Sequence, residues 1–187
     1  MFELTNTYKK KKTYSDYAAK DDGYRYELIN GELIMVPGPS KFHQKSGGDL
    51  YVSLYLFITG NNLGEIYYAP YDVILDENNT VQPDILFISN ENSLNNQDKA
   101  LYGAPDLVVE IISPSSVIYD RNIKKELYEK YGVKEYWLVD IENKTVEIFE
   151  NIEGKFSLFS YAVEKGKLTS KVLNGFEVEI KDILPNL

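Results

Sequence analysis

A short apolar run at residues 107–112 constrains the fold of this chain most strongly, because one carboxylate, Glu110, stands inside it. Apolar runs of this length predict a strand that is buried on both faces. Successive side chains of a strand point to opposite faces, so Glu110 shares its face with Val108 and Ile112. A buried carboxylate without a partner takes up a proton. Glu110 therefore needs a cation, a basic partner or a catalytic task.

The segments that follow this run predict how the strand is connected. Residues 119–131 have the spacing of a helix that Gly132 ends, and residues 135–140 form a second buried run. The buried stripe of the helix is expected at Ile123, Leu127 and Tyr131. A strand–helix–strand unit needs a crossover, so the two strands are predicted to be parallel neighbours.

The remaining segments predict a mixture of strands and helices. Asn30-Gly31 between two apolar runs is the strongest short signal for a β-hairpin, and Ser40 is expected to cap a helix ending near residue 59. Strands are expected at residues 26–29, 32–36, 65–69, 71–75, 81–88, 145–149, 155–161 and 176–180, with a polar loop at residues 89–99. We expect an α+β (mixed α/β) fold with one curved mixed sheet flanked by helices.

The composition predicts a globular protein without disulfides or membrane-spanning segments. A chain of 187 residues with 43% hydrophobic residues predicts one globular domain over residues 1–187, in which residues 1–12 form a flexible basic segment. The sequence has no Cys, which excludes disulfides and thiolate metal sites. We find no signal peptide and no apolar run that could span a membrane, so the expected location is the cytoplasm. The net charge of −9 argues against broad electrostatic binding to nucleic acid, although a local site remains open.

Two further residues are candidates for chemistry beside Glu110. Asp84 interrupts the apolar run at residues 81–88, and its carboxylate would meet that of Glu110 if the two strands pair. Two carboxylates and water suit Mg²⁺ or Mn²⁺, which prefer oxygen ligands. Lys124 lies on the flank of the crossover helix and could reach back over the strand. Its ammonium group could position a water molecule or neutralise a phosphate.

Several separate blocks resemble one family. They are Asn30-Gly31-Glu32-Leu33, His43, Gln82-Pro83-Asp84, residues 105–111, Ser113-Pro114-Ser115, residues 120–128 and residues 132–140. Together they resemble the Uma-two family of the restriction-endonuclease-like superfamily, whose signature is PD-(D/E)XK, over roughly residues 13–184. The resemblance implies a nuclease core in which Asp84 and Glu110 bind the metal. Ile112 stands where the signature has Lys, and Lys124 fits a lysine that has migrated to the helix, with Lys125 as the adjacent competitor.

Three more residues are additional candidates, each with a structural alternative. His43 is an active-site contact or an exposed residue at a helix start. Glu32, ranked ahead of Glu27, is an extra ligand for metal or water or one polar position of a hairpin. Asp120 belongs to the site or stabilises the helix N-terminus through the dipole. The second Pro-Asp, at Asp106, is interpreted as strand entry.

The first functional hypothesis is a metal-dependent nuclease that uses Mg²⁺ or Mn²⁺ to hydrolyse phosphodiester bonds in DNA, with Asp84, Glu110 and Lys124 in the active site. The second is a non-catalytic binding or regulatory module that retains the nuclease fold and binds a divalent ion or a protein, such as a second copy of the chain in a homodimer. A glycosidase with paired acids leaves Lys124 without a role. A purely structural Glu110–Lys124 ion pair is the remaining alternative.

Overall fold

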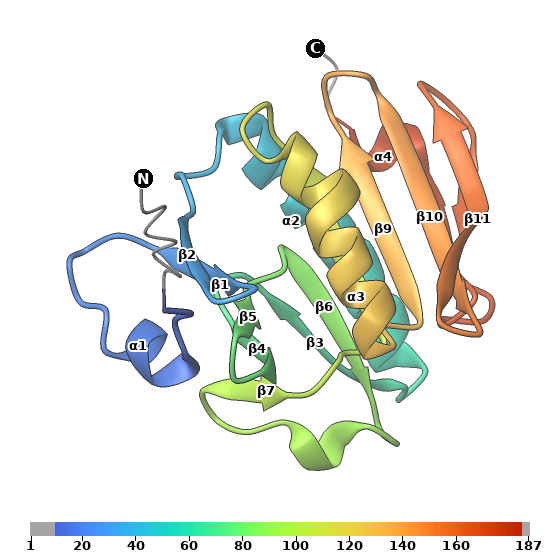
Figure 1. Cartoon of the computed structure of the whole chain (residues 1–187). Coiled ribbons are helices and arrows are strands. Elements are labelled where there is room, and N and C mark those ends of the chain that lie inside the picture. Colours follow the sequence, from blue (N-terminus) through green and yellow to red (C-terminus); the bar gives the residue numbers. More distant parts are fainter. Residues whose placement is uncertain (1–9, 185–187) are drawn as a thin grey trace.

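The computed structural model describes residues 10–184, which form two mixed sheets with helices around them (Figure 1). The larger sheet has the order β11-β10-β9-β8-β6-β3, with strands Lys155–Val163, Thr145–Ile152, Glu135–Asp140, Leu107–Ile112, Ile85–Ser89 and Gly64–Tyr68. The smaller sheet has the order β2-β1-β5-β4-β7, with strands Glu32–Met35, Tyr26–Ile29, Asn79–Val81, Asp72–Asp76 and Ala100–Tyr102. A two-stranded sheet pairs β12 (Lys167–Thr169) with β13 (Glu177–Glu179). The helices are α1 (Tyr14–Ala18), α2 (Lys41–Gly60), α3 (Lys125–Tyr131), α4 (Ile180–Ile183), a 3₁₀ turn at Ser93–Asn95 and a π-helix at Tyr119–Lys124.

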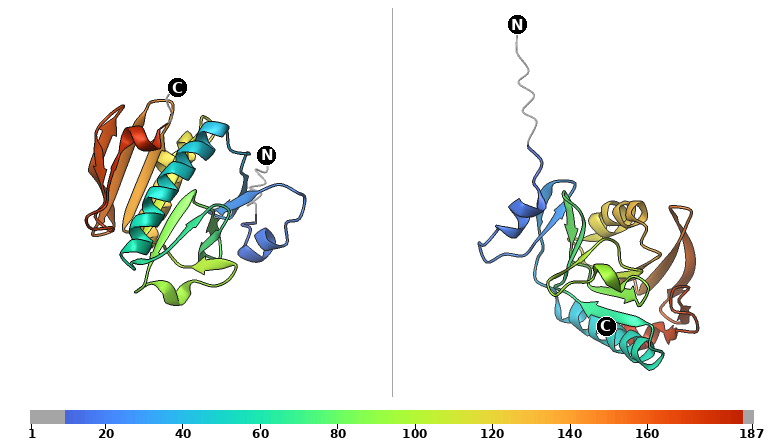
Figure 2. Two further views of the ribbon diagram at one scale, coloured as in Figure 1. Left: turned by 180° about the vertical axis from the view of Figure 1, so that it is seen from behind. Right: turned by 90° about the horizontal axis from the view of Figure 1, so that it is seen from below.

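Strand β8 lies inside the larger sheet and confirms the predicted alternation. Leu107, Val109 and Ile111 belong to the core that includes buried residues of α2, whereas Val108 and Ile112 belong to the core that includes Leu127 of α3. Helices α2 and α3 lie on opposite faces of this sheet (Figure 2). The sheet is therefore covered on both sides, and Glu110 faces the α3 side.

The crossover from β8 to β9 is parallel, as predicted, with Glu110 opposite Leu138. Gly132 ends the crossover helix in the left-handed conformation (φ 81°). The predicted helix over residues 119–131 is confirmed, but its first half, residues 119–124, is a π-helix. A π-turn holds more residues than an α-turn, so it shifts the phase of the helix. The expected stripe is correspondingly wrong at two positions: Ile123 and Tyr131 are only partly buried, while Lys124 and Tyr128 are buried with Leu127.

The prediction of one curved sheet is wrong, because the run at residues 81–88 is divided between two sheets. Its first residue, Val81, ends β5 in the smaller sheet, and residues 85–88 lie in β6 of the larger one. Pro83 has no backbone N–H to continue a ladder, so the strand breaks at this point. The predicted pairing with β8 is correct: β6 runs antiparallel to it with Ile85 opposite Val109, which brings Asp84 next to Glu110. Strand β7 was not predicted, since its segment adjoins the polar loop.

The first half of the chain follows the sequence signals closely. Asn30 and Gly31 take positive φ angles of 53° and 81° between β1 and β2, as a tight hairpin requires. The Ser40 side chain accepts a hydrogen bond from the backbone N–H of His43 and caps α2. The prediction for residues 1–12 falls mostly outside the described residues, but within them the Lys12 backbone N–H donates to the Gly31 carbonyl at 2.8 Å. None of the helices in residues 10–184 has the length and apolar character needed to cross a membrane.

Candidate active site

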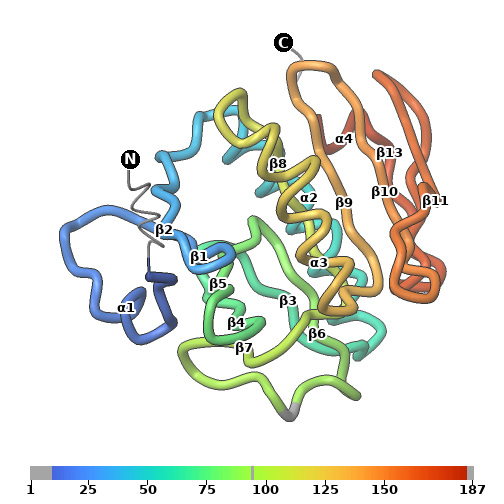
Figure 3. The backbone as a smooth tube through the Cα atoms, in the orientation of Figure 1, coloured from blue at the N-terminus to red at the C-terminus, as the bar shows by residue number. Residues whose placement is uncertain are grey.

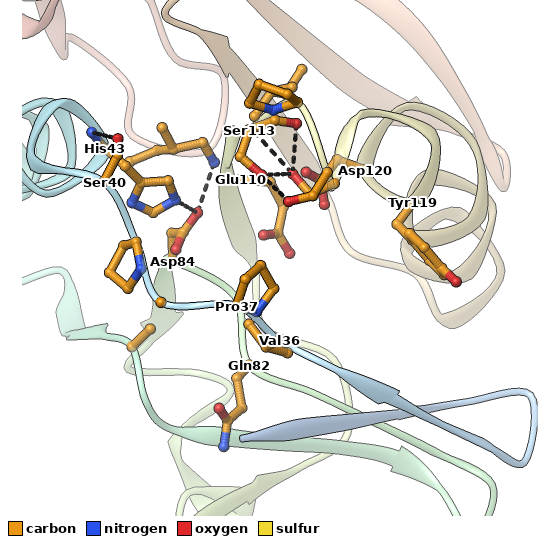
Figure 4. Close-up of a pocket in the computed structure, with 18 of the residues that line it drawn as sticks. Val36, Pro37, Ser40, His43, Gln82, Asp84, Glu110, Ser113, Tyr119 and Asp120 are labelled. Carbon is orange, nitrogen blue, oxygen red and sulfur yellow. Dashed lines mark hydrogen bonds and ion pairs between the residues drawn. The ribbon is translucent and has the colours of Figure 1, made fainter. Parts of the chain in front are cut away.

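The predicted acids lie at the boundary between the two sheets, in a pocket of about 530 Å³ (Figure 4). Asp84 follows the Pro83 break between β5 and β6, and Glu110 lies in β8. The connection from β2 to α2 forms one wall of the pocket, and the loop between β8 and the π-helix forms another. The sheet boundary therefore places groups from distant parts of the sequence around one cavity.

Asp84 is held by one backbone group and one side chain. Its Oδ2 accepts a hydrogen bond from the backbone N–H of Ile111 at 2.8 Å and lies 3.2 Å from Nε2 of His43. His43 stands in the first turn of α2, so this helix orients the carboxylate from the opposite wall. Among the described residues, nothing donates a hydrogen bond to Oδ1 of Asp84, which leaves that oxygen for a ligand.

Glu110 is 3% exposed and is also bound through one oxygen. Its Oε1 accepts hydrogen bonds from Lys124 Nζ at 3.1 Å and from the Tyr128 hydroxyl at 2.6 Å. Oε2 accepts no hydrogen bond from the described residues. This oxygen is not fully enclosed by protein atoms, and Glu110 lines the pocket. Each of the two acids thus has one fixed oxygen and one free oxygen.

Lys124 connects Glu110 to two other acids. Its Nζ lies 2.9 Å from Oε1 of Glu27 and 3.8 Å from Oδ1 of Asp120. Glu27 comes from β1, and its Oε1 also accepts a hydrogen bond from the backbone N–H of Gln82 at 2.8 Å. Lys124 is the last residue of the π-helix, and the side chain is 8% exposed. The shifted phase of that helix is what turns Lys124 from the flank toward the acids.

Burial and mutual repulsion govern ionisation in this cluster. Burial raises the pKa of Glu110 well above its usual value; Lys124 opposes this, and Asp120 and Asp84 reinforce it. Burial likewise raises the pKa of Asp120 to about 6. Burial alone would lower the pKa of Lys124, but the charges of Glu110, Glu27 and Asp120 raise it well above 10.5. Lys124 therefore contacts more acids than its single charge can neutralise.

His43 responds to the same charges. Burial lowers the pKa of its imidazole, but the hydrogen bond and the charge of Asp84, with the charge of Asp120, outweigh burial and raise the pKa above 6.5. The side chain is 14% exposed and lines the pocket. His43 is therefore placed in the site and not as an exposed residue at the helix start.

The other predicted residues divide between the site and its surroundings. Asp120 lies in the acidic cluster at 2% exposure. Glu32 is exposed on β2 and does not line the pocket, where Glu27 lies instead. The amine of Lys125 lies 3.7 Å from the centre of the Phe149 ring, away from the acids, so the structure brings Lys124 and not Lys125 to Glu110. Asp106 enters β8 as interpreted, and its carboxylate lies 2.6 Å from Lys134 Nζ.

Tyr128 is the contact that sequence reasoning missed. It lies on the helix face that was expected to be a flank, and a buried Tyr is normally assigned to the core. A usable signal was its spacing: four residues after Lys124 on one helix, the two side chains share a face and reach the same strand residue. The Tyr128 hydroxyl then needs an acceptor, which Glu110 provides.

The donor set fits a hard divalent cation. Free oxygens of Asp84 and Glu110 border a cavity that holds excess negative charge. Within residues 10–184, no group of three or more His, Cys, Asp and Glu side chains has the geometry to hold a metal ion. Mg²⁺ is commonly bound by one or two carboxylates together with water and substrate phosphate, so two acids suffice for this mode of binding.

Comparison with known proteins identifies a solved structure with the same fold. The fold matches that of a crystal structure described as "a putative nuclease belonging to DUF820 from Anabaena variabilis ATCC 29413", with a TM-score of 0.75 over 91% of this chain and 96% of that one. The sequences are 16% identical, so this likeness concerns the fold alone, and the two proteins share one α+β architecture.

The family follows from the sequence match. Residues 12–181 match the model of the family described as "Uma2: Putative restriction endonuclease", and the chain belongs to this family. The uncharacterized protein sll1609 of Synechocystis sp. (strain ATCC 27184 / PCC 6803 / Kazusa) is 27% identical over 128 residues, which cover 67% of this chain and 72% of that protein. The resemblance and the α+β fold class predicted from the sequence are both confirmed.

Proposed function

We propose that the protein is a metal-dependent nuclease that hydrolyses phosphodiester bonds in DNA. One observation carries the proposal. Asp84 and Glu110 each have a free oxygen at the same cavity, and the Lys124 amine donates a hydrogen bond to Glu110. A bound Mg²⁺ or Mn²⁺ would polarise a phosphoryl oxygen and lower the pKa of a bound water molecule. Family membership supports hydrolysis of phosphodiester bonds as the reaction class. The geometry of the pocket supports Asp84, Glu110 and Lys124 as the residues of the active site.

The side chains have separate roles in this proposal. Lys124 stays protonated because three carboxylates raise its pKa, so it acts as a charge and a hydrogen-bond donor and not as a base. It would stabilise negative charge as it develops on the phosphoryl oxygens. Glu110 and Asp84 would hold the metal through their free oxygens. Tyr128 and His43 would keep these carboxylates in orientation.

A cleavage assay with matched variants tests the proposal. We expect Mg²⁺- or Mn²⁺-dependent cleavage of DNA that falls by about 10²- to 10³-fold in Asp84→Asn, Glu110→Gln and Lys124→Met. Lys125→Met and Glu32→Gln are the controls, since they remove the same charges from neighbouring positions outside the pocket. Cleavage that is unaltered in Glu110→Gln and Lys124→Met would contradict the assignment.

A second candidate function is a binding or regulatory module that keeps the fold without turnover. The net charge of −9 and the surplus of acids in the pocket favour it, because these features oppose broad contact with a polyanion. Such a module would bind a divalent ion or a protein, including a second copy in a homodimer. Mn²⁺ titration by calorimetry with a parallel cleavage assay separates the candidates: binding without cleavage of any DNA favours the module.

A further inference from the structure

We propose that the pocket admits a single DNA strand and not an intact duplex. This inference rests on the proposed nuclease function and concerns the form of the substrate. It is carried by three observations: the depth of the acids, the two walls of the pocket and the distribution of charge along them.

The acids lie too deep for a phosphate that remains on the outside of a rigid double helix. Glu110 and Lys124 are 3% and 6% exposed, and the side chain of Asp84 is 19% exposed. A phosphate must enter the cavity to reach their free oxygens. A cavity of about 530 Å³ lies in the range of roughly 300–1,000 Å³ that holds small ligands, which is the size of one or two nucleotides.

The walls stand on both sides of the acids, and the wall between β2 and α2 is largely apolar. One side is lined by Met35 at the end of β2, by Pro37 and Pro39 in the connection from β2 to α2, and by Phe42 in the first turn of α2. The loop after β8 and Tyr119 form the opposite side of the pocket (Figure 4). Figure 3 shows the course of the backbone through both segments. The two prolines restrict the backbone of the connection, so the wall resists opening to a wider cleft.

The charges on these walls are unsuited to a duplex. The lining contains two Lys or Arg side chains, Arg25 and Lys124, of which Lys124 is buried among carboxylates. It also contains five acids, Glu27, Asp84, Glu110, Asp120 and Glu142. Binding of a double helix relies on many Lys and Arg contacts to phosphates along both strands.

The exposed apolar groups instead suit unstacked bases. Phe42 is 36% exposed and Met35 is 54% exposed, and both line the pocket. In proteins that bind single strands, bases stack on aromatic side chains without regard to sequence. A single strand could place a phosphate on the acids and a base against Phe42.

Matched oligonucleotides test this inference with the full chain. A labelled single strand, its blunt duplex and the same duplex carrying a single-stranded flap are incubated with Mn²⁺, and kcat/KM is measured for each. We expect the single strand to be cleaved at least 10-fold faster than the duplex, and the flapped substrate to be cut within its flap. Equal cleavage of the single strand and the blunt duplex would overturn the inference.

Variants of α2 test the wall. Phe42→Ala is expected to raise KM for the single strand about 10-fold with a smaller effect on kcat, because a stacking surface is lost. Tyr55→Ala is the control, since Tyr55 is a 45% exposed aromatic residue of the same helix outside the pocket. An unchanged KM in Phe42→Ala, or an equal change in the control, would count against the proposed wall.

Binding distinguishes failure of this inference from failure of the nuclease proposal. Fluorescence anisotropy with Glu110→Gln and Ca²⁺ measures the affinity for each oligonucleotide without cleavage. Tighter binding of the single strand when no DNA is cut by the wild type would support the pocket inference and refute the nuclease. Equal or absent binding of both forms would overturn the inference.

Discussion

At the scale of single residues, Glu110 depends on partners from one helix. The Lys124 amine and the Tyr128 hydroxyl both bind Oε1, which leaves Oε2 free. Burial and the negative charge of Glu110 raise the pKa of Tyr128, so its hydroxyl stays protonated and remains a donor. Tyr128 is therefore a positioning residue for the proposed reaction, since it acts through Glu110.

Tyr128→Phe should alter the pH dependence of cleavage. Without the hydroxyl, the ionised form of Glu110 loses a hydrogen bond, so its pKa rises further. We expect kcat to fall about 10-fold and the pH of half-maximal activity to rise by roughly one to two units. The measurement is kcat against pH with Mg²⁺ at saturation.

Tyr136→Phe provides the matched control for this experiment. Tyr136 is also fully buried and lies beside Tyr128, with ring centres 5.2 Å apart, but its hydroxyl donates to the backbone carbonyl of Asp120 at 2.9 Å. Its removal should leave the pH profile in place. A profile that moves equally in both variants would assign Tyr128 to packing alone.

Asp120 should make the metal-free protein less stable as pH rises. Its pKa is 3.8 in the unfolded chain and about 6 in the fold, so folding favours the protonated form. The contribution to stability is complete below pH 4 and is lost as pH rises through 6. Asp120→Asn should thus increase the free energy of unfolding at pH 7 by up to roughly 3 kcal/mol.

Urea denaturation at several pH values measures this effect. The difference between Asp120→Asn and the wild type is the informative quantity, because acids with lowered pKa values, such as Asp106 and Asp140, act equally in both proteins. The difference should grow between pH 4 and 6. A difference that is constant with pH would refute the assignment to Asp120.

At the scale of elements, the sequence predicted what depends on local rules. The alternation along β8 and the Asn30-Gly31 turn follow from side-chain direction and backbone sterics, which neighbouring residues determine. The π-helix was missed, because an apolar stripe does not reveal which carbonyl each N–H will reach. Its register depends on Lys124 and Tyr128 meeting Glu110, a contact between separate elements.

The two central acids of the candidate site could be predicted from the sequence, but Glu27 as a further partner of Lys124 could not. Asp84 and Glu110 were found because each is a lone acid in an apolar run, and their strands pair as expected. Glu27 was ranked below Glu32, although both belong to the same hairpin. Only the packing of that hairpin against the crossover helix determines which of the two faces Lys124.

At the scale of the whole molecule, a different buried acid ties the C-terminal segment to the larger sheet. Glu135 in β9 is 0% exposed. Its Oε2 accepts hydrogen bonds from the backbone N–H groups of Lys171 and Val172 at 2.6 and 3.0 Å, and its Oε1 accepts one from Ser170 Oγ at 2.8 Å. This carboxylate is fully occupied and has no oxygen left for a ligand, unlike Glu110.

Glu135→Gln should therefore destabilise the fold without changing the active site. The amide has one acceptor oxygen in place of two, so buried N–H groups lose a partner, at a cost of about 2–4 kcal/mol in the free energy of unfolding. Glu150→Gln is the control, since Glu150 pairs with Glu135 across the strands and should change stability by less than about 0.5 kcal/mol. Urea denaturation gives both values, and equal stability of the two variants would refute the role of Glu135.

The order of the site residues along the chain has a consequence for synthesis of the protein. Glu27, Glu110 and Asp120 all precede Lys124, so a growing chain contains the three acids before their shared cation is made. The crossover helix also supplies Tyr128, and β9 follows it to complete the parallel pair. A nascent chain that stops before Lys124 lacks the counter-charge that these three acids share in the folded protein. The charge balance of this cluster is therefore completed only after most of the acids and both sheets' first strands have been made.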